Sequence, residues 1–308
     1  MCCYKMEKTT KLTSKQTILI AGATGNIGSA AAVALAKGGA HVVLLGRRPD
    51  KLTAKADLIR GALSEARLDY QDRGIDMLVI DFSDMESVRL AATEAINRFP
   101  ILNGLILSVG AYIQNGPNIL SSGHEVMFAT NVMGPFLFTQ LLLKSVEQSD
   151  GLILHVIAPF DKGIDWDDLE SIKTHRAMTA FNRTKTCNRV IAGELARRYT
   201  GRISSVAFDP TYVIDKADPD LGKRWPSGFM GLFWRMMTVL FAKPPGVAGE
   251  PMADLMLQHQ DRSKLNGALF KLDKRIEKPD KAMNDEALGK RLWDELVLLT
   301  GLRLEGAT

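Results

Sequence analysis

The sequence has little cysteine and no block of charge of one sign. Each of these features argues against particular classes of protein. Its three cysteines, Cys2, Cys3 and Cys187, are too few and too irregularly spaced for a disulfide framework or a metal cluster. We therefore expect free thiols, no bound metal and a reducing compartment, the cytoplasm. The net charge of +4 comes from scattered lysines and arginines, which indicates a solvated basic surface rather than a nucleic-acid-binding one.

The start of the chain also lacks a long apolar run. Residues 1–15 are mostly polar or charged, so they predict neither a secretory signal nor a spanning helix. We expect a flexible N-terminal tail there, with acylation of Cys2 or Cys3 as the alternative. The chain as a whole is 46% hydrophobic, which is enough for one large core or two modest ones.

What the sequence does contain is an alternation of short apolar, β-branched runs with longer helical segments. Such runs are typical of strands buried on both faces of a parallel sheet. The predicted strands are 17–22, 41–46, 77–82, 104–110, 151–158, 202–208 and 267–272. One helix between them is predicted to begin with a capping box, Ser83-x-x-Glu86. Without linkers or repeats, the pattern predicts one α/β domain over 16–308, a doubly wound Rossmann-type sheet with an insertion at about 215–245.

The first predicted strand leads into three regularly spaced glycines, Gly22, Gly25 and Gly28, directly before a helix. Glycines let the backbone approach a pyrophosphate, and a helix N-terminus offers it unpaired N–H groups. The second strand ends at Arg47 and Arg48, where an acidic residue would hold the ribose hydroxyl of NAD. Two guanidiniums suit a 2′-phosphate instead, so the sequence favours NADP(H) over NAD(H).

The third strand ends in an acidic residue whose role the sequence leaves open. Asp81 lies where its side chain could meet the adenine amino group of a bound dinucleotide. It could equally cap the helix that follows. Both roles remain predictions at this stage.

Taken together, several segments resemble the short-chain dehydrogenase/reductase superfamily, and most of all its retinol-dehydrogenase-like branch. The resemblance covers almost the whole length of the chain. The segments that carry it are GATGNIG, GRRPDK, VIDFSDMESV, FATNVMGPFLFTQLLL, IDWDDL, KTCNRVIAGELARR, FDPTYV and RLWDELVLLTGL.

The resemblance implies roles for individual residues. Lys185 matches the lysine that binds the nicotinamide ribose, and Asn131 matches the asparagine that supports this lysine through a water. The family's catalytic tyrosine falls at Phe181, and its serine falls at about Ala158. Both proton-handling hydroxyls are therefore missing. The implied cofactor-binding residues are Gly22, Thr24, Gly25, Asn26, Ile27, Gly28, Arg47, Arg48, Asp81, Phe82, Ser108, Gly110, Lys185, Pro210, Tyr212 and Val213, and the implied substrate-pocket residues are Ala158, Phe160, Phe181 and Trp234.

Loss of both hydroxyls raises the question of what protonates the product. Hydride transfer to a ketone leaves an alkoxide, and a positioned acid contributes roughly 10²- to 10⁴-fold to the rate. The predicted substitutes are Tyr112, in first place, then Tyr212, His155 and Asp161. Each also has a structural interpretation, as a wall residue for the tyrosines, a helix-facing strand residue for His155 and a solvated loop residue for Asp161.

Other chemistries would need less from the site. An iminium acceptor requires no proton, and a conjugated C=C spreads the charge into an enolate that weaker donors can hold. A non-redox cyclase or isomerase, and a non-catalytic dinucleotide-binding protein, also fit the sequence. The first two alternatives remain reductases, and the last two do not.

The insertion contains a segment rich in Trp, Phe, Met and Leu at 224–246, where the family builds its substrate lid. That composition predicts a bulky apolar substrate. The segment is too short to span a membrane and carries Arg235 midway. Contact with a membrane surface or with a second copy of the chain, as in a homodimer, are the two alternatives.

Overall fold

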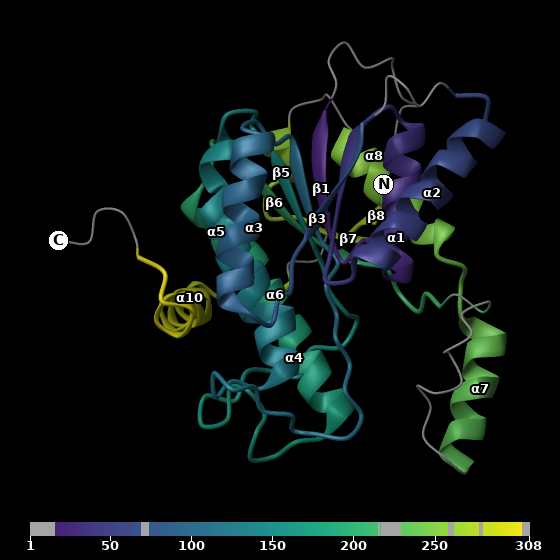
Figure 1. Ribbon diagram of the computed structural model, residues 1–308. Helices are drawn as coiled ribbons and strands as arrows, with labels where there is room; N and C mark the ends of the chain where they lie inside the picture. Colours follow the sequence, from purple (N-terminus) through teal and green to yellow (C-terminus); the bar gives the residue numbers. More distant parts are fainter. Residues whose placement is uncertain are drawn as a thin grey trace.

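The computed structural model describes residues 16–68, 74–214, 216, 229–257, 262–276 and 280–303. The N-terminal tail predicted over 1–15 and much of the predicted insertion, 217–228, lie outside these residues. Within them, the chain forms one sheet covered by helices on both faces (Figure 1).

The sheet has the strand order β3-β2-β1-β4-β5-β6-β7-β8. All neighbouring strands are parallel except β7 and β8. The strands are β1 (Thr17–Ala21), β2 (His41–Gly46), β3 (Ile75–Val79), β4 (Gly104–Leu107), β5 (Leu152–Val156), β6 (Ser204–Asp209), β7 (Leu269–Lys271) and β8 (Lys274–Arg275). The doubly wound sheet and its seven predicted strands are confirmed. The two-residue β8 escaped prediction because it has no apolar residue.

Two hydrophobic cores lie on the two faces of this sheet. The first face carries α1 (Asn26–Lys37), α2 (Pro49–Glu65) and α8 (Gly246–Leu257). The second carries α3 (Met85–Arg98), α4 (Val126–Phe128), η1 (Ala129–Met133), α5 (Gly134–Glu147), α6 (Ala177–Arg198), α9 (Lys281–Asn284) and α10 (Glu286–Thr300). Alternate side chains of each strand point to opposite faces, so β1 contributes Leu19 to one core and Ile20 to the other.

The first turn of α3 differs from the predicted capping box. Asp84 is the N-cap, and its side chain accepts a hydrogen bond from the Glu86 N–H at 3.0 Å. The Ser83 hydroxyl donates to Asp81 at 2.7 Å instead. The prediction was wrong by one residue because Asp and Ser are both good caps, and tertiary packing selected the second of two adjacent candidates.

One helical stretch among the described residues, Val126–Glu147, is long and apolar enough to span a membrane by length and composition. Of its most apolar window, 78% is buried inside the protein. The stretch comprises α4, η1 and α5, and it packs against α3 and α6 in the second core. Its apolar character is thus explained by its place inside the fold.

The insertion after β6 contains α7 (Phe229–Phe241), which breaks the alternation of strands and helices as predicted. In Figure 1, α7 projects from the side of the molecule. Contacts that join it to the body include the Tyr212 hydroxyl, which lies 2.8 Å from Thr238 Oγ1, and the pairing of Val213 with Lys243 just after the helix.

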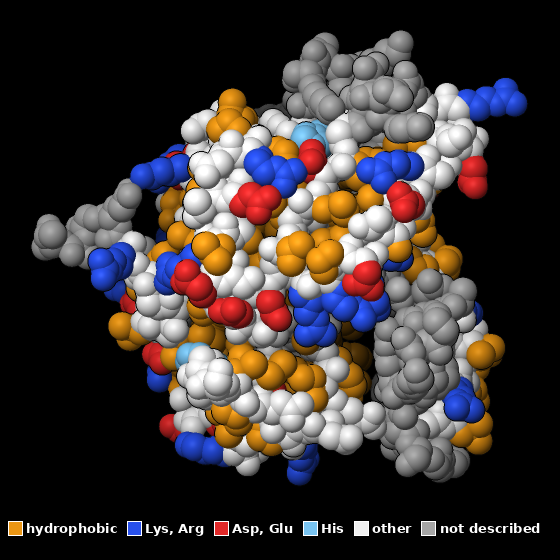
Figure 2. All heavy atoms as spheres, in the orientation of Figure 1, with side chains coloured by type: hydrophobic (Ala, Val, Ile, Leu, Met, Phe, Trp, Pro, Cys, Tyr) orange, Lys and Arg blue, Asp and Glu red, His pale blue; other side chains and the backbone are white. Residues whose placement is uncertain are grey.

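Figure 2 shows that acidic, basic and hydrophobic side chains are interspersed over one face of the molecule. No block of one charge is seen among the described side chains of this face. This distribution agrees with the scattered charge of the sequence.

Candidate functional site

The turn after β1 is built so that only glycine fits at two of its positions. Gly22 has φ +81°, and a Cβ there would lie 2.6 Å from the Ser108 carbonyl oxygen. A Cβ on Gly28 would overlap the carbonyl oxygen of Gly22. The α1 N-cap, Gly25, is exposed and provides no side-chain cap. The first N–H groups of α1 are therefore free of side chains, which fits a pyrophosphate.

The predicted phosphate-binding arginines lie at the end of β2, beside this turn. Arg47 and Arg48 are both exposed. Thr24 is close by, because a Cβ built on Gly46 would lie 3.3 Å from its Cγ2. Two exposed guanidiniums at this position fit the 2′-phosphate of NADP(H).

Asp81 and Phe82, which follow β3, differ in burial: Asp81 is half-buried, whereas Phe82 is buried. The carboxylate of Asp81 accepts hydrogen bonds from the Ser83 N–H at 2.9 Å and the Ser83 hydroxyl at 2.7 Å. Since Asp84 is the N-cap of α3, Asp81 is not, and its adenine contact stays a prediction. The ring of Phe82 is buried edge-on against Phe138, which leaves only its backbone for the predicted contact with a cofactor.

Lys185 lies where the strands β4 and β5 end. It is buried on α6, and its ammonium group donates to the carbonyl oxygens of Val109 at 2.6 Å and Val156 at 3.3 Å. These carbonyls follow or end β4 and β5, so Lys185 joins the ends of two central strands. Burial lowers the pKa of Lys185 to about 8.

Phe181 lies one helical turn before Lys185 and packs beside it. The ring centroid is 5.7 Å from Lys185 Nζ and 5.8 Å from the ring of Tyr112, which meets it edge-on. The side chain of Tyr112 is 39% exposed, and its hydroxyl makes no recorded hydrogen bond within the described part of the chain. Partial burial raises the pKa of Tyr112, so its phenol is protonated at neutral pH.

Asn131 is fully buried in η1, a single π-helical turn. Its Oδ1 accepts from the Ala111 N–H at 2.7 Å, while its Nδ2 donates to the Ala111 carbonyl at 2.9 Å and to Thr184 Oγ1 at 3.1 Å. Both amide protons are thus used without Lys185. Asn131 thus fixes Ala111, two residues after the Val109 carbonyl that binds Lys185, and its support of the lysine through a water stays a prediction.

Tyr212 and its neighbours line the far side of the site. The Tyr212 hydroxyl is bonded to Thr238 on α7, so Tyr212 tethers this helix, and its role as a proton donor stays a prediction. The alternative predicted from the sequence, a wall residue whose hydroxyl bonds the backbone, agrees better with this contact. The partner of the Tyr212 hydroxyl is, however, a side chain and not the backbone. Pro210 is buried after β6, and Val213 pairs with Lys243.

His155, the third predicted proton donor, is buried in β5 and its Nε2 has no hydrogen-bond partner. Burial, with the nearby charge of Lys185, lowers its pKa to about 3, which keeps the imidazole neutral. Asp161 accepts from the Gly163 N–H at 2.9 Å and from Thr186 Oγ1 at 3.1 Å in an exposed loop. These surroundings agree with the structural interpretations of both residues, and their role as proton donors stays a prediction.

The predicted pocket residues are only partly brought together. Ala158 is held by Arg189, which donates to its carbonyl at 2.7 Å and pairs with Asp280 at 2.9 Å. The ring of Phe160 is 62% exposed beside it. The side chain of Trp234 lies outside the described residues. Sequence reasoning missed Arg189, because nothing in its spacing distinguishes it from other arginines of α6.

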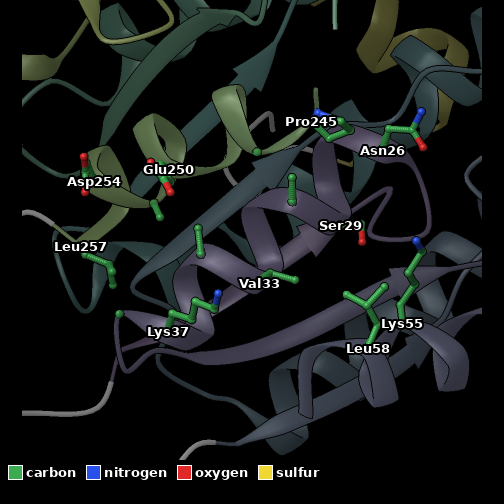
Figure 3. Close-up of a pocket in the computed structure, with 15 residues that line it drawn as sticks. Asn26, Ser29, Val33, Lys37, Lys55, Leu58, Pro245, Glu250, Asp254 and Leu257 are labelled. Atoms are coloured by element: carbon green, nitrogen blue, oxygen red, sulfur yellow. The ribbon is translucent and has the colours of Figure 1, made fainter. Parts of the chain in front are cut away.

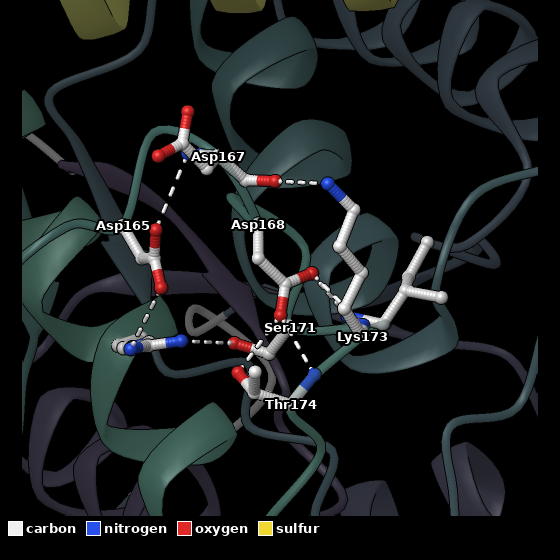
Figure 4. A network of polar contacts seen from close by, with 8 residues as sticks. Asp165, Asp167, Asp168, Ser171, Lys173 and Thr174 are labelled. Atoms are coloured by element: carbon white, nitrogen blue, oxygen red, sulfur yellow. Dashed lines mark hydrogen bonds and ion pairs between the residues drawn. The ribbon is translucent and has the colours of Figure 1, made fainter.

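The loop between β5 and α6 is held by a buried carboxylate (Figure 4). Asp168 accepts hydrogen bonds from the N–H groups of Ile172, Lys173 and Thr174 and from the Thr174 hydroxyl, all between 2.8 and 3.0 Å. Burial alone would raise the pKa of Asp168, but the bonds from Lys173, Thr174 and Ile172 outweigh it and lower the pKa. The carboxylate therefore orders the chain that leads into α6.

Asp168→Asn is expected to destabilise the protein by about 3 kcal/mol at pH 7, because an amide nitrogen would face the N–H donors. The folded-state pKa is depressed, so this stabilisation exists above the unfolded value, about 3.9, and is lost as the pH falls through the folded value. Urea unfolding at pH 7 and pH 3 measures it. Asp167→Asn, at the exposed neighbouring carboxylate, should change little. Equal effects of the two variants would contradict this role.

A cavity of about 570 Å³ lies between α1, α2 and α8 (Figure 3). Its lining runs along the outer side of α1 and includes Val33, Leu58 and Leu257, with Glu250 and Asp254 on α8. Asn26 is its one residue from the predicted cofactor set. Gly22, Arg47 and Lys185 are not among the residues that line this cavity.

Residues 16–159 match a family model described as short chain dehydrogenase. Retinol dehydrogenase 14 from Homo sapiens is 28% identical over 299 residues, which cover 93% of this chain and 87% of that protein. L-Sorbose reductase from Gluconobacter frateurii, solved with NADPH and L-sorbose, has a TM-score of 0.65 at 16% identity, over 84% of this chain and 95% of that one. A short-chain type dehydrogenase/reductase from Mycobacterium ulcerans has a TM-score of 0.64 at 18% identity, over 91% and 97%. The two solved structures share the fold.

Proposed function

Because the chain belongs to the short-chain dehydrogenase/reductase superfamily, on its retinol-dehydrogenase-like branch, we propose that it is an NADP(H)-dependent reductase of a bulky apolar substrate. The observation that carries this proposal is the group of Lys185, Phe181 and Tyr112 beside the glycine turn. The group keeps the lysine of a cofactor site, replaces the usual acid with an apolar ring, and leaves a phenol next to that ring.

NADP(H) is supported by two features. The N-terminus of α1 at Gly25 is exposed and carries no side-chain cap, which suits a pyrophosphate, and Arg47 and Arg48 offer two exposed guanidiniums to a 2′-phosphate. Lys185 would hold the ribose hydroxyls. When bound, the dinucleotide supplies a hydride.

The residues around Lys185 would divide the remaining work. Phe181 supplies an apolar wall and no proton, while the phenol of Tyr112 can donate a proton to the oxygen of a carbonyl or an enolate. The Lys185 ammonium stabilises negative charge that develops near it. The exposed ring of Phe160 and the apolar wall suit a large hydrophobic substrate. Retinol, which the name of the human relative mentions, is an apolar isoprenoid of that kind.

The experiment that tests the proposal follows NADPH oxidation with a panel of bulky ketones, enones and imines. We expect turnover with at least one class. Product formed without NADPH oxidation would instead indicate a cyclase or isomerase. Nucleotide binding without any product would indicate a dinucleotide-binding protein, and either result would overturn the reductase.

Tyr112→Phe is expected to lower kcat for ketone or enone reduction by roughly 10²- to 10⁴-fold, since it removes the proposed acid. Calorimetry should give an unchanged Kd for NADPH. Tyr199→Phe removes a hydroxyl that lies 3.5 Å from Gln140 Oε1 at the C-terminal end of α6, and it should leave kcat unaltered. Full activity of Tyr112→Phe would assign the proton to another group.

Phe181→Tyr is expected to raise ketone reduction tenfold or more, because the new phenol would lie beside Lys185, whose charge lowers the pKa of a neighbouring phenol. Reduction of an iminium ion, which needs no further proton, should not gain. Initial rates with matched ketone and imine substrates separate the two cases. A gain with imines alone would count against the missing-acid explanation.

A further inference from the structure

After β5 the chain leaves the sheet through residues 157–162, which we call the exit segment. At its start, the Ile157 N–H still donates to the Phe208 carbonyl of β6 at 2.9 Å. Burial then falls along the segment: Ile157 is buried, Ala158 is half-buried and Phe160 is exposed. The exit segment thus carries Ala158 and Phe160, two of the predicted substrate-pocket residues.

The peptide between Ala158 and Pro159 has a single hydrogen-bonding group. Proline has no N–H, so this peptide can be anchored through the Ala158 carbonyl alone. Arg189, one helical turn after Lys185 on α6, donates to that carbonyl at 2.7 Å. A carbonyl that is turned into the protein needs such a donor, because a buried acceptor without a partner costs stability. Arg189 therefore sets the direction in which the chain leaves β5.

The guanidinium of Arg189 is itself held on a second side. Only 8% of the residue is exposed, and its other terminal nitrogen pairs with Asp280 at 2.9 Å. The same carboxylate caps α9, because its second oxygen accepts from the Met283 N–H at 3.0 Å. A planar guanidinium that is bonded on two sides has little freedom to turn. Asp280 thus fixes Arg189, and Arg189 fixes Ala158.

A second side chain of α6 holds the far end of the exit segment. The hydroxyl oxygen of Thr186 accepts from the Lys162 N–H at 3.2 Å, and the same hydroxyl donates to Asp161 at 3.1 Å. Phe160 lies between the two anchors with its side chain 62% exposed. The place of its ring therefore depends on these anchors more than on packing of the ring itself.

We propose that Arg189, held by Asp280, is a positioning residue that fixes the exit segment and so places the Phe160 ring against the apolar part of the substrate. The substrate part of this role rests on the proposed function. Because Asp280 is the N-cap of α9, the packing of α9 on α6 is connected to the substrate wall. Loss of the Ala158 bond should loosen this wall, so that a large substrate binds more weakly while kcat is kept.

The variant Arg189→Met/Asp280→Asn removes the bond to the exit segment without leaving a buried charge unpaired. Asparagine is also a good N-cap, so α9 keeps its first hydrogen bond. Arg197→Met is the matched control, because Arg197 also joins α6 to α9 by donating to the Met283 carbonyl at 2.7 Å. Among the described residues, its other bonds run to Glu194 and not to the exit segment. Thermal unfolding verifies that both variants are folded.

Hydrogen exchange of the nucleotide-free protein, followed at individual amides by NMR, measures the exit segment directly. In the double variant we expect the amides of Ile157 and Lys162 to exchange at least about tenfold faster, while Ile153, buried in the centre of β5, keeps its native rate. The control variant should exchange like the native protein at all three. Native rates at Ile157 and Lys162 in the double variant would overturn the proposal. Equal acceleration at Ile153 would also overturn it, because it would indicate general destabilisation.

Benzylideneacetone and 3-penten-2-one are the substrate probes, because they share one enone and differ in a phenyl against a methyl group. In the double variant we expect KM for benzylideneacetone to rise about tenfold at similar kcat, and KM for 3-penten-2-one to change less than about threefold. The calorimetric Kd for NADPH should stay native. Equal changes with the two enones would show that Phe160 does not contact the substrate, and would overturn that part of the role.

Failure of the proposed function gives a different result from failure of the positioning role. A native protein that oxidises NADPH with neither enone would count against the reductase and against the substrate contact of Phe160. The exchange rates need no turnover, so they decide in either case whether Arg189 positions the exit segment.

Discussion

The double variant Arg47→Ala/Arg48→Ala is expected to weaken NADPH binding by about a hundredfold or more while leaving NADH binding within about threefold. A hydrogen bond to a charged group contributes about 1.5–3 kcal/mol, and about 1.4 kcal/mol corresponds to tenfold in Kd. Both guanidiniums are exposed at the end of β2, and α2 begins without a side-chain cap from Arg48. The double substitution should therefore reach the phosphate contact without unfolding the helix.

Isothermal calorimetry with NADPH and NADH measures this discrimination. Arg60→Ala is the matched control, because it removes one cation from α2, the helix that follows Arg48, at a residue paired with Asp57. It should shift both affinities little. Equal weakening of NADPH and NADH by the double variant would mean that the arginines do not meet the 2′-phosphate. Undetectable binding of both nucleotides by the native protein would remove the basis of the proposed function.

Lys185→Met is expected to change the pH dependence of stability more than any surface substitution. In the folded protein burial lowers the pKa of Lys185 to about 8, whereas an unfolded lysine has about 10.4. Between these values the unfolded chain binds a proton that the folded protein does not, so native stability rises with pH in that window. The rise amounts to about 2 kcal/mol between pH 7 and pH 9.5, and the Met variant should lack it.

Urea unfolding of the nucleotide-free protein at pH 7 and pH 9.5 gives the comparison. The difference in free energy of unfolding between native protein and variant is the quantity to follow, because it cancels other titrating groups. Lys290→Met, at an exposed lysine of α10, should leave the pH dependence unchanged. A pH-independent difference for Lys185→Met would show that Lys185 is not buried as a cation. The same variant should bind NADPH more weakly, since the proposed ribose contact is gone.

The two variants lie at the two ends of the site, and the sequence alone predicts these two ends to different extents. Gly22, Gly28, Arg47 and Arg48 lie close together in sequence around two strands, and their role follows from backbone geometry and charge type. The catalytic end joins residues from β4, η1, β5 and α6. The resemblance supplied Lys185 and Asn131 but not the actual partners of Asn131, because Ala111 and Thr184 meet only when the strands and helices pack.

Packing also bears on the predicted ranking of proton donors, which stays a prediction. The sequence placed Tyr112 first, then Tyr212, His155 and Asp161. In the fold Tyr212 is bonded to Thr238 and His155 is buried and neutral, while Tyr112 lies against Phe181 with its hydroxyl open. The hydrogen-bond partner of the Tyr212 hydroxyl comes from α7, and the ring that contacts Tyr112 comes from α6. Both helices are separated along the chain from the tyrosines that they contact.

The sequence by itself determined the parallel sheet, the glycine turn, the two arginines and the loss of the tyrosine at Phe181. These features are local: they depend on periodicity, on backbone freedom and on which functional groups a side chain carries. Only the tertiary structure decided that Asp84 caps α3, that Asn131 fixes Ala111, and that Arg189 binds the carbonyl of Ala158. Each of these depends on which groups are desolvated and which find partners across distant segments, and that is fixed only when the chain is packed.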